Sequence, residues 1–344
     1  MDRDIEESAR RRFLRATVGL GIGAGLGLSP PFVRAQADEP VTTALSWVPN
    51  VQYAGYWLAI EKGLFRAEHI LPQYLVGGPN APASVVRLAT GQALVGESNW
   101  LPLLDVVNQG NDFVIIGGAP KSAAGLISLP RRPILTPQDM VGARFLVQGA
   151  TERTAIAATF SLNKLPNDYK FVPAGFSPEP LLSGSGDAYC CFITNQPGIL
   201  ENMGMKPGKD FIVTRLDELG YRVPTTLIVV QRRTIEQQRP LLVAYLRALL
   251  RGWAENAKNP AVAAQLVISK YGADLGLDLN QQTRQNQLQI PLLRASSTSE
   301  MLWLSPQLLI DSMYPAARAT GRTRLPDPAR IMDMSLLEEA YKGL

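Results

Sequence analysis

The chain has 344 residues, of which 46% are hydrophobic and 19% are charged. This length is greater than one hydrophobic core usually needs, so we expect two lobes. The ordinary composition excludes a largely disordered chain. The net charge is only +4 and no run rich in lysine or arginine follows the first residues, which argues against a nucleic-acid partner.

The first residues resemble an export signal. Arg10, Arg11 and Phe13 fit the twin-arginine pattern, and residues 16–32 form an uncharged stretch rich in glycine and alanine. That stretch is short and glycine-rich for a transmembrane helix. We therefore predict a signal that the twin-arginine translocase reads. A membrane anchor or a basic tail without function is the alternative interpretation.

A signal-peptidase site follows the uncharged stretch. Ala35 and Ala37 place small side chains at the two positions that the peptidase reads, so residues 1–37 form the predicted signal peptide. Cleavage after Ala37 would leave a mature chain that begins at Asp38. No later segment has the roughly 18 consecutive apolar residues of a membrane span, so we expect a soluble protein in the periplasm.

Short apolar runs alternate with helical segments along the mature chain, a pattern typical of α/β lobes. The first lobe has predicted strands at residues 41–46, 73–76, 94–96 and 113–118 and predicted helices at 52–63, 82–90 and 101–108. The second lobe has predicted strands at 143–147 and 187–193 and a predicted helix that ends near 162. A strand at 226–230 and helices at 241–258, 261–271, 283–293 and 306–319 are predicted to complete the chain.

We expect the chain to leave the first lobe, build the second and return. The predicted boundaries put the first lobe at residues 38–128 and the second lobe at 129–224. Residues 225–344 then return to the first lobe and add the C-terminal helices. The predicted fold is therefore α/β, with two lobes joined by a hinge of two crossings. A cleft between lobes is a favoured place for a small-molecule ligand.

Several short segments, taken in chain order, resemble one protein family. They are residues 46–50, 52–56, 61–65, 77–80, 88–93, 136–142, 187–188 and 194–197. Together they resemble the NMT1/THI5-like periplasmic binding proteins. The resemblance implies a type II periplasmic binding fold and, as partner, the permease of an ABC transporter.

The ligands known for this family include thiamine pyrimidine precursors, riboflavin and sulfonates. The opening with Trp47 and Pro49, followed by the Gly-Gly-Pro-Asn run at 77–80, is most similar to the binders of aromatic heterocycles. The resemblance therefore implies a small aromatic heterocycle. A taurine-type sulfonate binder is the alternative, and a thiamine pyrimidine synthase-like enzyme is a less favoured one.

Related fungal enzymes make the thiamine pyrimidine from a histidine of their own and pyridoxal phosphate, and they carry a run of cysteines. Here Cys190, Cys191 and Phe192 only partly match that run, at a different place, and the sole histidine, His69, is predicted to end a helix in the left-handed conformation. We expect two buried thiols, with a strained vicinal disulfide as the alternative. We predict no catalytic residue, cofactor or metal, although catalysis by carboxylates or lysine stays open.

The predicted ligand-binding residues lie at strand ends, in the turns that follow and at the start of one helix. They are Trp47, Asn50, Tyr53, Gly77, Gly78, Asn99, Trp100, Ala150, Thr151, Asp187, Asn195 and Gln196. Aromatic rings would stack on a flat ligand, amides would bond to its edge, and helix N–H groups favour anions or carbonyl oxygens. Competing structural roles are a core position for the tryptophans, a tight turn for the glycines and a strand-start cap for Asp187.

Overall fold

The computed structural model describes residues 37–344 except 79 and 296–299, and residues 37–344 form one compact unit. The predicted signal residues Arg10, Arg11, Phe13 and Ala35 lie outside the described residues. Ala37, the last residue of the predicted signal peptide, is the first described residue and is exposed. None of the helices in the described part of the chain is long and apolar enough to cross a membrane.

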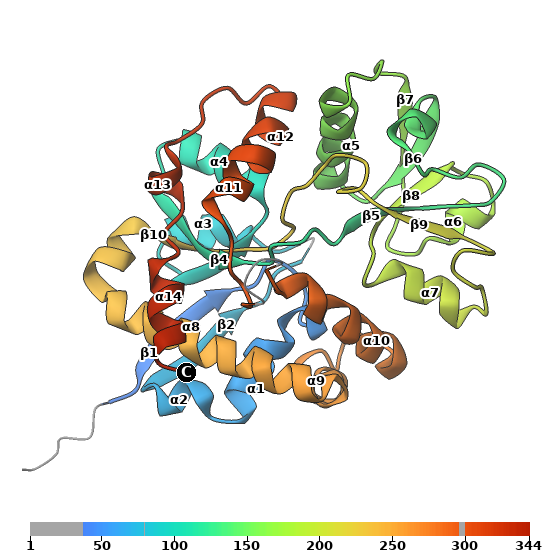
Figure 1. Ribbon diagram of the computed structural model, residues 1–344. Coiled ribbons are helices and arrows are strands. Elements are labelled where there is room, and N and C mark those ends of the chain that lie inside the picture. The colour runs from blue at the N-terminus through green and yellow to red at the C-terminus, as the bar shows by residue number, and fades with distance from the viewer. Residues whose placement is uncertain (1–36, 79, 296–299) are drawn as a thin grey trace, which may run out of the picture. The chain divides into compact units, whose positions relative to one another are not determined.

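Two five-stranded sheets organise the unit (Figure 1). We call the first sheet and the helices that pack on it lobe 1. Its strands, in spatial order, are β2 (Ile70–Leu75), β1 (Glu39–Ala44), β3 (Val95–Ser98), β10 (Leu227–Gln231) and β4 (Phe113–Gly118). Strand β1 pairs in parallel with β2 and β3, whereas β10 runs antiparallel between β3 and β4. The returning chain therefore completes the first sheet.

The second sheet and its helices form lobe 2. Its strands, in spatial order, are β7 (Tyr169–Pro173), β6 (Ala143–Val147), β8 (Ala188–Phe192), β5 (Ala124–Ser128) and β9 (Ile212–Arg215). Strand β6 pairs in parallel with β7 and β8, and β5 pairs antiparallel with β8 and β9. Each sheet thus contains one antiparallel strand beside its parallel ones.

The crossings between the sheets lie at residues 119–123, from β4 to β5, and at 216–226, from β9 to β10. Both can be followed in Figure 1 as the green and yellow segments that join the sheets. The predicted return at 224–225 falls inside the second crossing. The first crossing comes before the predicted boundary at 128–129, because β5 belongs to the second sheet. The apolar sequence of β5 does not reveal in which sheet this strand pairs.

Long and short helices pack on the sheet of lobe 1. They are α1 (Ala54–Glu61), α2 (Leu64–Ala67), α3 (Ser84–Ala89), α4 (Trp100–Asn108) and α8 (Arg232–Lys258). The predicted apolar stripe of α8 is confirmed, since Leu242, Leu246, Leu249 and Trp253 are all buried. Helices α1 and α8 pack closely at two glycines. A Cβ on Gly55 would overlap the Trp253 ring, and one on Gly252 would overlap the Gly55 carbonyl.

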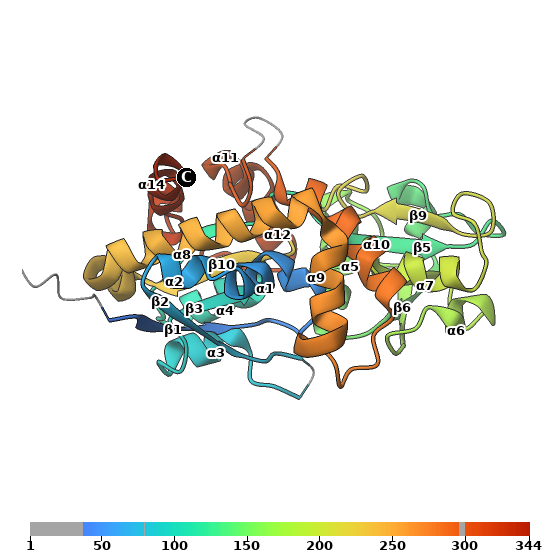
Figure 2. The same cartoon turned by 90° about the horizontal axis from the view of Figure 1, so that it is seen from below.

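Lobe 2 carries α5 (Ala150–Leu162), α6 (Glu179–Leu182) and α7 (Gln196–Asn202), and a 3₁₀ turn at Pro137–Met140. The C-terminal part contains α9 (Pro260–Leu266), α10 (Leu279–Gln289), α11 (Pro306–Leu308), α12 (Tyr314–Ala319), α13 (Pro328–Ile331) and α14 (Ser335–Lys342). Two π-helical turns lie at Val267–Tyr271 and Leu309–Met313, and a 3₁₀ turn lies at Ile290–Leu293. Helices α10 and α12 contact α7 and α5 of lobe 2, and α13 and α14 contact β4 of lobe 1, so the C-terminal part touches both lobes. Figure 2 shows α8, α9 and α10 following one another toward lobe 2.

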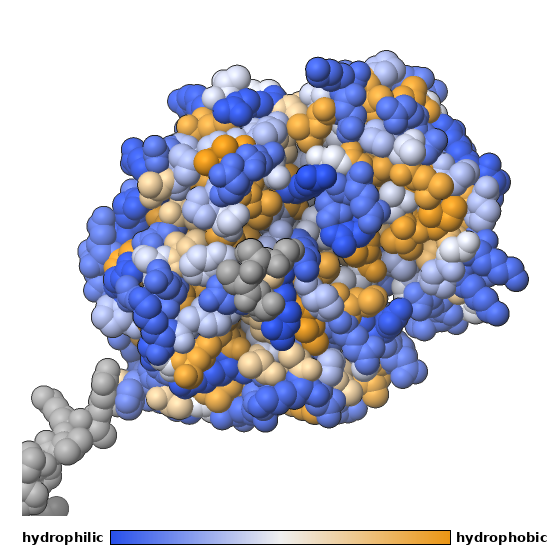
Figure 3. All heavy atoms as spheres, in the orientation of Figure 1, coloured by the Kyte–Doolittle hydropathy of each residue, from blue (hydrophilic) through white to orange (hydrophobic). Residues whose placement is uncertain are grey.

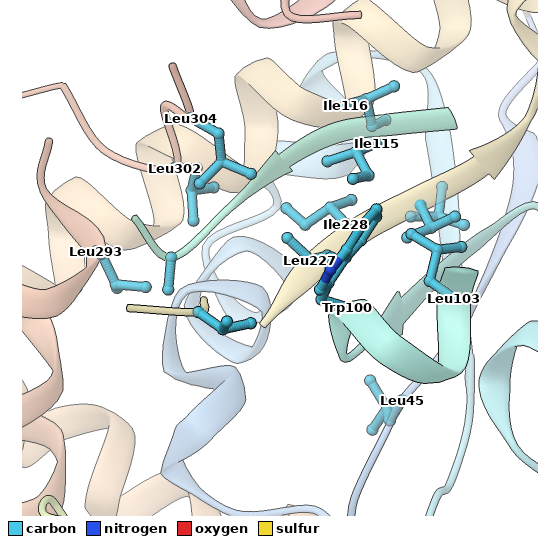
Figure 4. Packing of buried hydrophobic residues seen from close by; sticks show 14 of the residues in the cluster. Leu45, Trp100, Leu103, Ile115, Ile116, Leu227, Ile228, Leu293, Leu302 and Leu304 are labelled. Carbon is cyan, nitrogen blue, oxygen red and sulfur yellow. The ribbon is translucent and has the colours of Figure 1, made fainter. Parts of the chain in front are cut away.

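The core of lobe 1 lies around β4 and β10. Figure 4 shows Trp100 from α4 among Ile115 and Ile116 of β4 and Leu227 and Ile228 of β10. The first four are entirely buried and Ile228 is nearly so. This packing makes Trp100 part of the support for the sheet.

Two local predictions can be checked directly. His69 has φ 57°, so it adopts the predicted left-handed conformation after α2. Cys190 and Cys191 are both free and buried on β8, which agrees with two separate thiols. Burial raises the pKa of each thiol well above its usual range.

Candidate ligand-binding site

A cavity of about 460 Å³ is lined by residues of both lobes and of the C-terminal part. Lobe 1 contributes Ser46, Trp47, Asn50, Gln52, Tyr53, Glu97 and Asn99, lobe 2 contributes Gln148, Gly149, Ala150, Thr151, Glu152, Phe192, Asn195 and Gln196, and α10 contributes Gln285 and Gln289. On the face drawn in Figure 3, hydrophilic residues (blue) cover much of the outer edge and hydrophobic residues (orange) gather over lobe 2. The volume suits a small organic ligand.

The segment after β1 forms an aromatic part of the lobe 1 wall. The Trp47 side chain is half-buried, and its backbone N–H donates to the Tyr53 hydroxyl at 2.7 Å. That hydroxyl also bonds to Ser46 Oγ at 3.2 Å, and the Tyr53 ring is almost fully buried against the edge of Trp57. Trp47 therefore has the ring that a ligand can reach, whereas Tyr53 holds the backbone that carries it.

Asn50, on the same wall, caps a short helix. Its Oδ1 accepts from the Gln52 backbone N–H at 2.7 Å, which caps the short 3₁₀ helix Val51–Tyr53. Its backbone carbonyl accepts from Trp57 Nε1 at 2.9 Å. Asn50 thus lines the cavity while fixing the turn between β1 and α1.

Glu97 lies near the carboxyl end of β3 and lines the same cavity. Ser46 Oγ donates to its Oε2 at 3.4 Å. Burial of the carboxyl raises the pKa of Glu97 to about 8, and hydrogen bonds from Ser46 and Gln52 only partly oppose this. Glu97 is not among the ligand-binding residues predicted from the sequence. The feature that could have indicated it is its position as an acidic residue near a strand end, two residues before the predicted Asn99.

The lobe 2 wall contains the turn from β8 into α7. Gln196 is fully buried, and its Oε1 accepts from the Phe192 backbone N–H at 2.8 Å. Its Nε2 has no hydrogen-bond partner among the described residues. The neighbouring Asn195 accepts through Oδ1 from Gln281 Nε2 of α10. Gln196, a residue of the cavity lining, therefore keeps a buried amide donor without an acceptor among the described residues.

Helix α5 begins at the cavity. Gly149 is its N-cap without a side-chain capping bond, and Ala150, Thr151 and Glu152 of the first turn all line the cavity. First-turn N–H groups have no partner within the helix and favour anions or carbonyl oxygens. Lys121, from the first crossing, lies on the same cavity, and its Nζ donates to the Pro291 carbonyl at 3.2 Å.

A second cavity of about 220 Å³ adjoins the first, because Asn99, Ala150 and Thr151 line both. Its walls include Cys190 and Cys191 of β8 and are largely apolar. The two cavities together extend from the Trp47 wall to the space between α4 and α5.

Eight of the predicted residues lie on the main cavity: Trp47, Asn50, Tyr53, Asn99, Ala150, Thr151, Asn195 and Gln196. The structure places the other four, Gly77, Gly78, Trp100 and Asp187, elsewhere. Strand ends and turns therefore located most of the cavity, but they did not separate lining residues from supporting ones.

The two glycines allow close approach of one backbone segment to another. A Cβ on Gly77 would overlap the backbone of Leu45 and Trp47, and Gly78 has φ +124° beside the Val48 side chain. The close approach supports the tight turn, which lets the loop after β2 lie against the loop after β1, and neither glycine lines the main cavity.

Trp100 is fully buried, and its Nε1 donates to the Met313 carbonyl at 2.7 Å. It reaches only the second cavity. Asp187 precedes β8, at the end opposite Asn195, and pairs with Arg132 at 3.0 Å and Arg144 at 3.1 Å. These bonds lower the pKa of Asp187 against the opposing effect of burial. Both side chains therefore have partners within the protein, which supports the structural roles given as their alternatives.

The NMT1/THI5 like family model matches residues 50–263. The chain belongs to the NMT1/THI5-like family. It is 22% identical over 273 residues to a formylaminopyrimidine-binding protein of Halalkalibacterium halodurans, covering 75% of this chain and 78% of that protein. It is 24% identical over 278 residues to the riboflavin-binding protein RibY of Chloroflexus aurantiacus, covering 76% and 75% respectively.

Solved structures share the fold. A putative periplasmic sulfonate-binding protein SsuA from Methylobacillus flagellatus KT superposes with a TM-score of 0.63 and 16% identity, covering 89% of this chain and 95% of that one. The desulfurization enzyme DSZB superposes with a TM-score of 0.56 and 14% identity, covering 89% and 99%. The chain therefore has the periplasmic binding protein fold, a fold that also occurs in an enzyme.

Proposed function

We propose that this protein captures a small, flat, nitrogen-rich heterocycle outside the cytoplasm and delivers it to an ABC importer. The observation that carries the proposal is a cavity with a reachable tryptophan on one lobe and an unpartnered buried amide, Gln196 Nε2, on the other. Such a site combines an aromatic wall for affinity with a few fixed polar groups for orientation. Family members named for formylaminopyrimidine and riboflavin support the ligand class.

The charges around the cavity support a heterocycle over an aliphatic anion. Glu97 and Glu152 contribute carboxyl groups to the lining, and Lys121 contributes an amine. Neither carboxyl group offers a positive charge to an anion, whereas a ring N–H group can donate to either one. A sulfonate is the second candidate, favoured by one observation, the first turn of α5 together with Lys121 on the cavity wall.

Titration calorimetry of the purified protein with formylaminopyrimidine, riboflavin and taurine tests the ligand class. We expect one of the two heterocycles to bind at micromolar concentration or below, and taurine to bind at least a hundredfold more weakly. Tighter binding of taurine than of either heterocycle would contradict the ligand class. That result would still be compatible with a role in transport.

We propose binding without turnover. His69 occupies the bend after α2 and is not on the main cavity, and the two cysteines are buried with raised pKa values, so they resist forming reactive thiolates. Incubation with pyridoxal phosphate and iron, followed by mass spectrometry, checks for a pyrimidine product and for loss of His69. If one pyrimidine forms for each protein molecule, the function is synthesis of the pyrimidine and the binding proposal is wrong.

Export by the twin-arginine route is also part of the proposal. Replacing Arg10 and Arg11 together with lysine should leave the precursor in the cytoplasm. The mature form should then disappear from the periplasmic fraction. Normal amounts of mature protein outside the cytoplasmic membrane would overturn this route.

A further inference from the structure

Glu97 is held at the cavity by groups of lobe 1. The Ser84 hydroxyl donates to the Glu97 backbone carbonyl, and β3 pairs with β10 at this residue, which fixes the backbone. Its carboxyl receives hydrogen bonds from Ser46 and Gln52, both neutral. The ion pairs formed among the described residues involve other carboxylates.

The charged and titratable groups near Glu97 come from several elements. Tyr53 and Tyr245 are close enough for Glu97 to contribute to the raised pKa of each, although burial is the larger cause. Lys121 and Glu152 lie on the wall of the same cavity. Because Lys121 donates to the Pro291 carbonyl, its amine already has a partner on the C-terminal part.

The opposite wall offers the complementary group. Gln196 Nε2 is a buried donor without a partner in the described structure, while Glu97 offers carboxyl oxygens. A buried polar group left unpaired lowers stability, so a bound ligand gains by pairing it. The ligand that satisfies both walls has a cationic or strongly donating nitrogen at one edge and an acceptor atom at the other.

We propose that Glu97 is the specificity-determining residue of this cavity and selects ligands with an amidine-like N–C–N edge, while Gln196 donates to an acceptor on the opposite edge. The inference rests on the proposed function and narrows its ligand class. Aminopyrimidines have such an edge. The carboxylate of Glu97 pairs with two N–H groups of a cationic edge, as carboxylates do with planar cations. In a neutral aminopyrimidine the ring nitrogen gains its N–H by taking the Glu97 proton, and the amino group supplies the other N–H.

Proton release follows from this pairing. With a pKa of about 8, the empty site holds Glu97 mostly protonated at pH 7. A cationic ligand stabilises the carboxylate, lowers that pKa and releases close to one proton on binding. Affinity for a permanent cation therefore rises with pH, by up to about tenfold per unit, and levels off above pH of about 8.

Benzamidine and benzamide are suitable probes, since they have nearly the same shape but only benzamidine carries a cationic N–C–N edge. We expect benzamidine to bind at least tenfold more tightly than benzamide at pH 7. Calorimetry in two buffers with different heats of ionisation should show the release of nearly one proton. Equal affinities, or no proton release, would overturn the proposal.

Two matched variants identify the responsible carboxyl group. Glu97→Gln should remove both the preference for benzamidine and the proton release. Glu152→Gln removes the other carboxyl group on the cavity and should preserve both. If Glu152→Gln abolishes the preference and Glu97→Gln does not, the proposal is wrong.

Thermal melts of the protein without ligand test whether the Glu97 carboxyl holds its proton in the folded state. Because the folded protein holds the Glu97 proton to about pH 8, and the unfolded chain releases it near its ordinary pKa, Glu97 lowers stability as pH rises between those values. Glu97→Gln should therefore raise the melting temperature relative to wild type more at pH 8 than at pH 5. A variant effect independent of pH would contradict the assignment.

The proposed function and this inference can fail separately. If formylaminopyrimidine or riboflavin binds but the benzamidine preference is absent, only the role of Glu97 fails. If no heterocycle binds at all, the proposed function itself fails.

Discussion

The two walls of the main cavity differ in how their polar groups are satisfied. On the lobe 1 wall, Asn50 and Tyr53 make hydrogen bonds within their own segment, and these bonds hold Trp47 in place. On the lobe 2 wall, the buried Gln196 keeps an unpartnered amide donor and α5 presents its first turn. The Trp47 platform is thus already held in place, whereas Gln196 and the first turn of α5 gain hydrogen bonds only when a ligand arrives. This difference favours closure around a ligand.

The largest effect on stability is expected in the buried core of lobe 1. Trp100→Ala removes a fully buried indole and its hydrogen bond to the Met313 carbonyl. We expect the free energy of unfolding to fall by about 3–5 kcal/mol, as for other buried aromatic residues. Urea titration checks this value. A loss of ligand affinity with unchanged stability would place Trp100 in the binding site after all.

Trp47→Ala tests the platform itself. The half-buried Trp47 ring lines the main cavity, and truncating an aromatic anchor typically costs about 2 kcal/mol of binding energy. We expect a roughly thirtyfold loss of affinity for whichever of formylaminopyrimidine or riboflavin binds. Thermal melts of the empty protein provide the control, and their shift should be much smaller than for Trp100→Ala. The reverse pattern would make Trp47 a core residue.

Gln196→Glu tests the unsatisfied wall. The substitution keeps an oxygen that accepts from the Phe192 N–H and replaces the free Nε2 donor by an acceptor. We expect about a tenfold loss of affinity, near the net value of one hydrogen bond to a buried group. Calorimetry measures this loss of affinity and compares it with that of Asn195→Ala. In the unsubstituted protein Asn195 Oδ1 already bonds to Gln281. A larger loss for Asn195→Ala would assign edge recognition to Asn195.

The smallest effect is expected at the rim between the lobes. Arg284 of α10 lies 3.9 Å from Glu201 of α7, and the pair is partly exposed, so it is worth less than about 1 kcal/mol. Arg284→Ala should weaken ligand binding less than about fivefold. Lys342→Ala, which breaks the exposed pair with Glu338 within α14, is the control and should leave affinity unchanged. Equal effects of both variants would show that the rim pair does not favour closure.

Much of the fold follows from local patterns in the sequence. The all-buried strand β4 is predicted at its observed bounds because six apolar or glycine residues stand between polar turns. Strand β7, Tyr-Lys-Phe-Val-Pro, was not predicted, since an edge strand with lysine and proline lacks a continuous apolar run. The first crossing was misplaced because pairing of β5 with β8 and β9 is a long-range property.

The site shows the same limit. Strand ends indicate where a cavity forms, but burial and pairing decide which side chain faces it. Asp187 pairs with arginines at 132 and 144, which are distant along the chain. The partners of the Glu97 carboxyl come from the loop after β1 and from η1 (Val51–Tyr53). Neither arrangement is visible in the sequence near those residues.

Native mass spectrometry of the protein purified from its native cells tests the central claim most directly, because it identifies what the two walls hold. We predict a one-to-one complex whose small molecule, released on denaturation, is a flat nitrogen-containing heterocycle. Loss of that mass from the Trp47→Ala protein would locate it at the platform. A sulfonate in the complex, or a heterocycle retained equally by wild type and Trp47→Ala, would contradict the account.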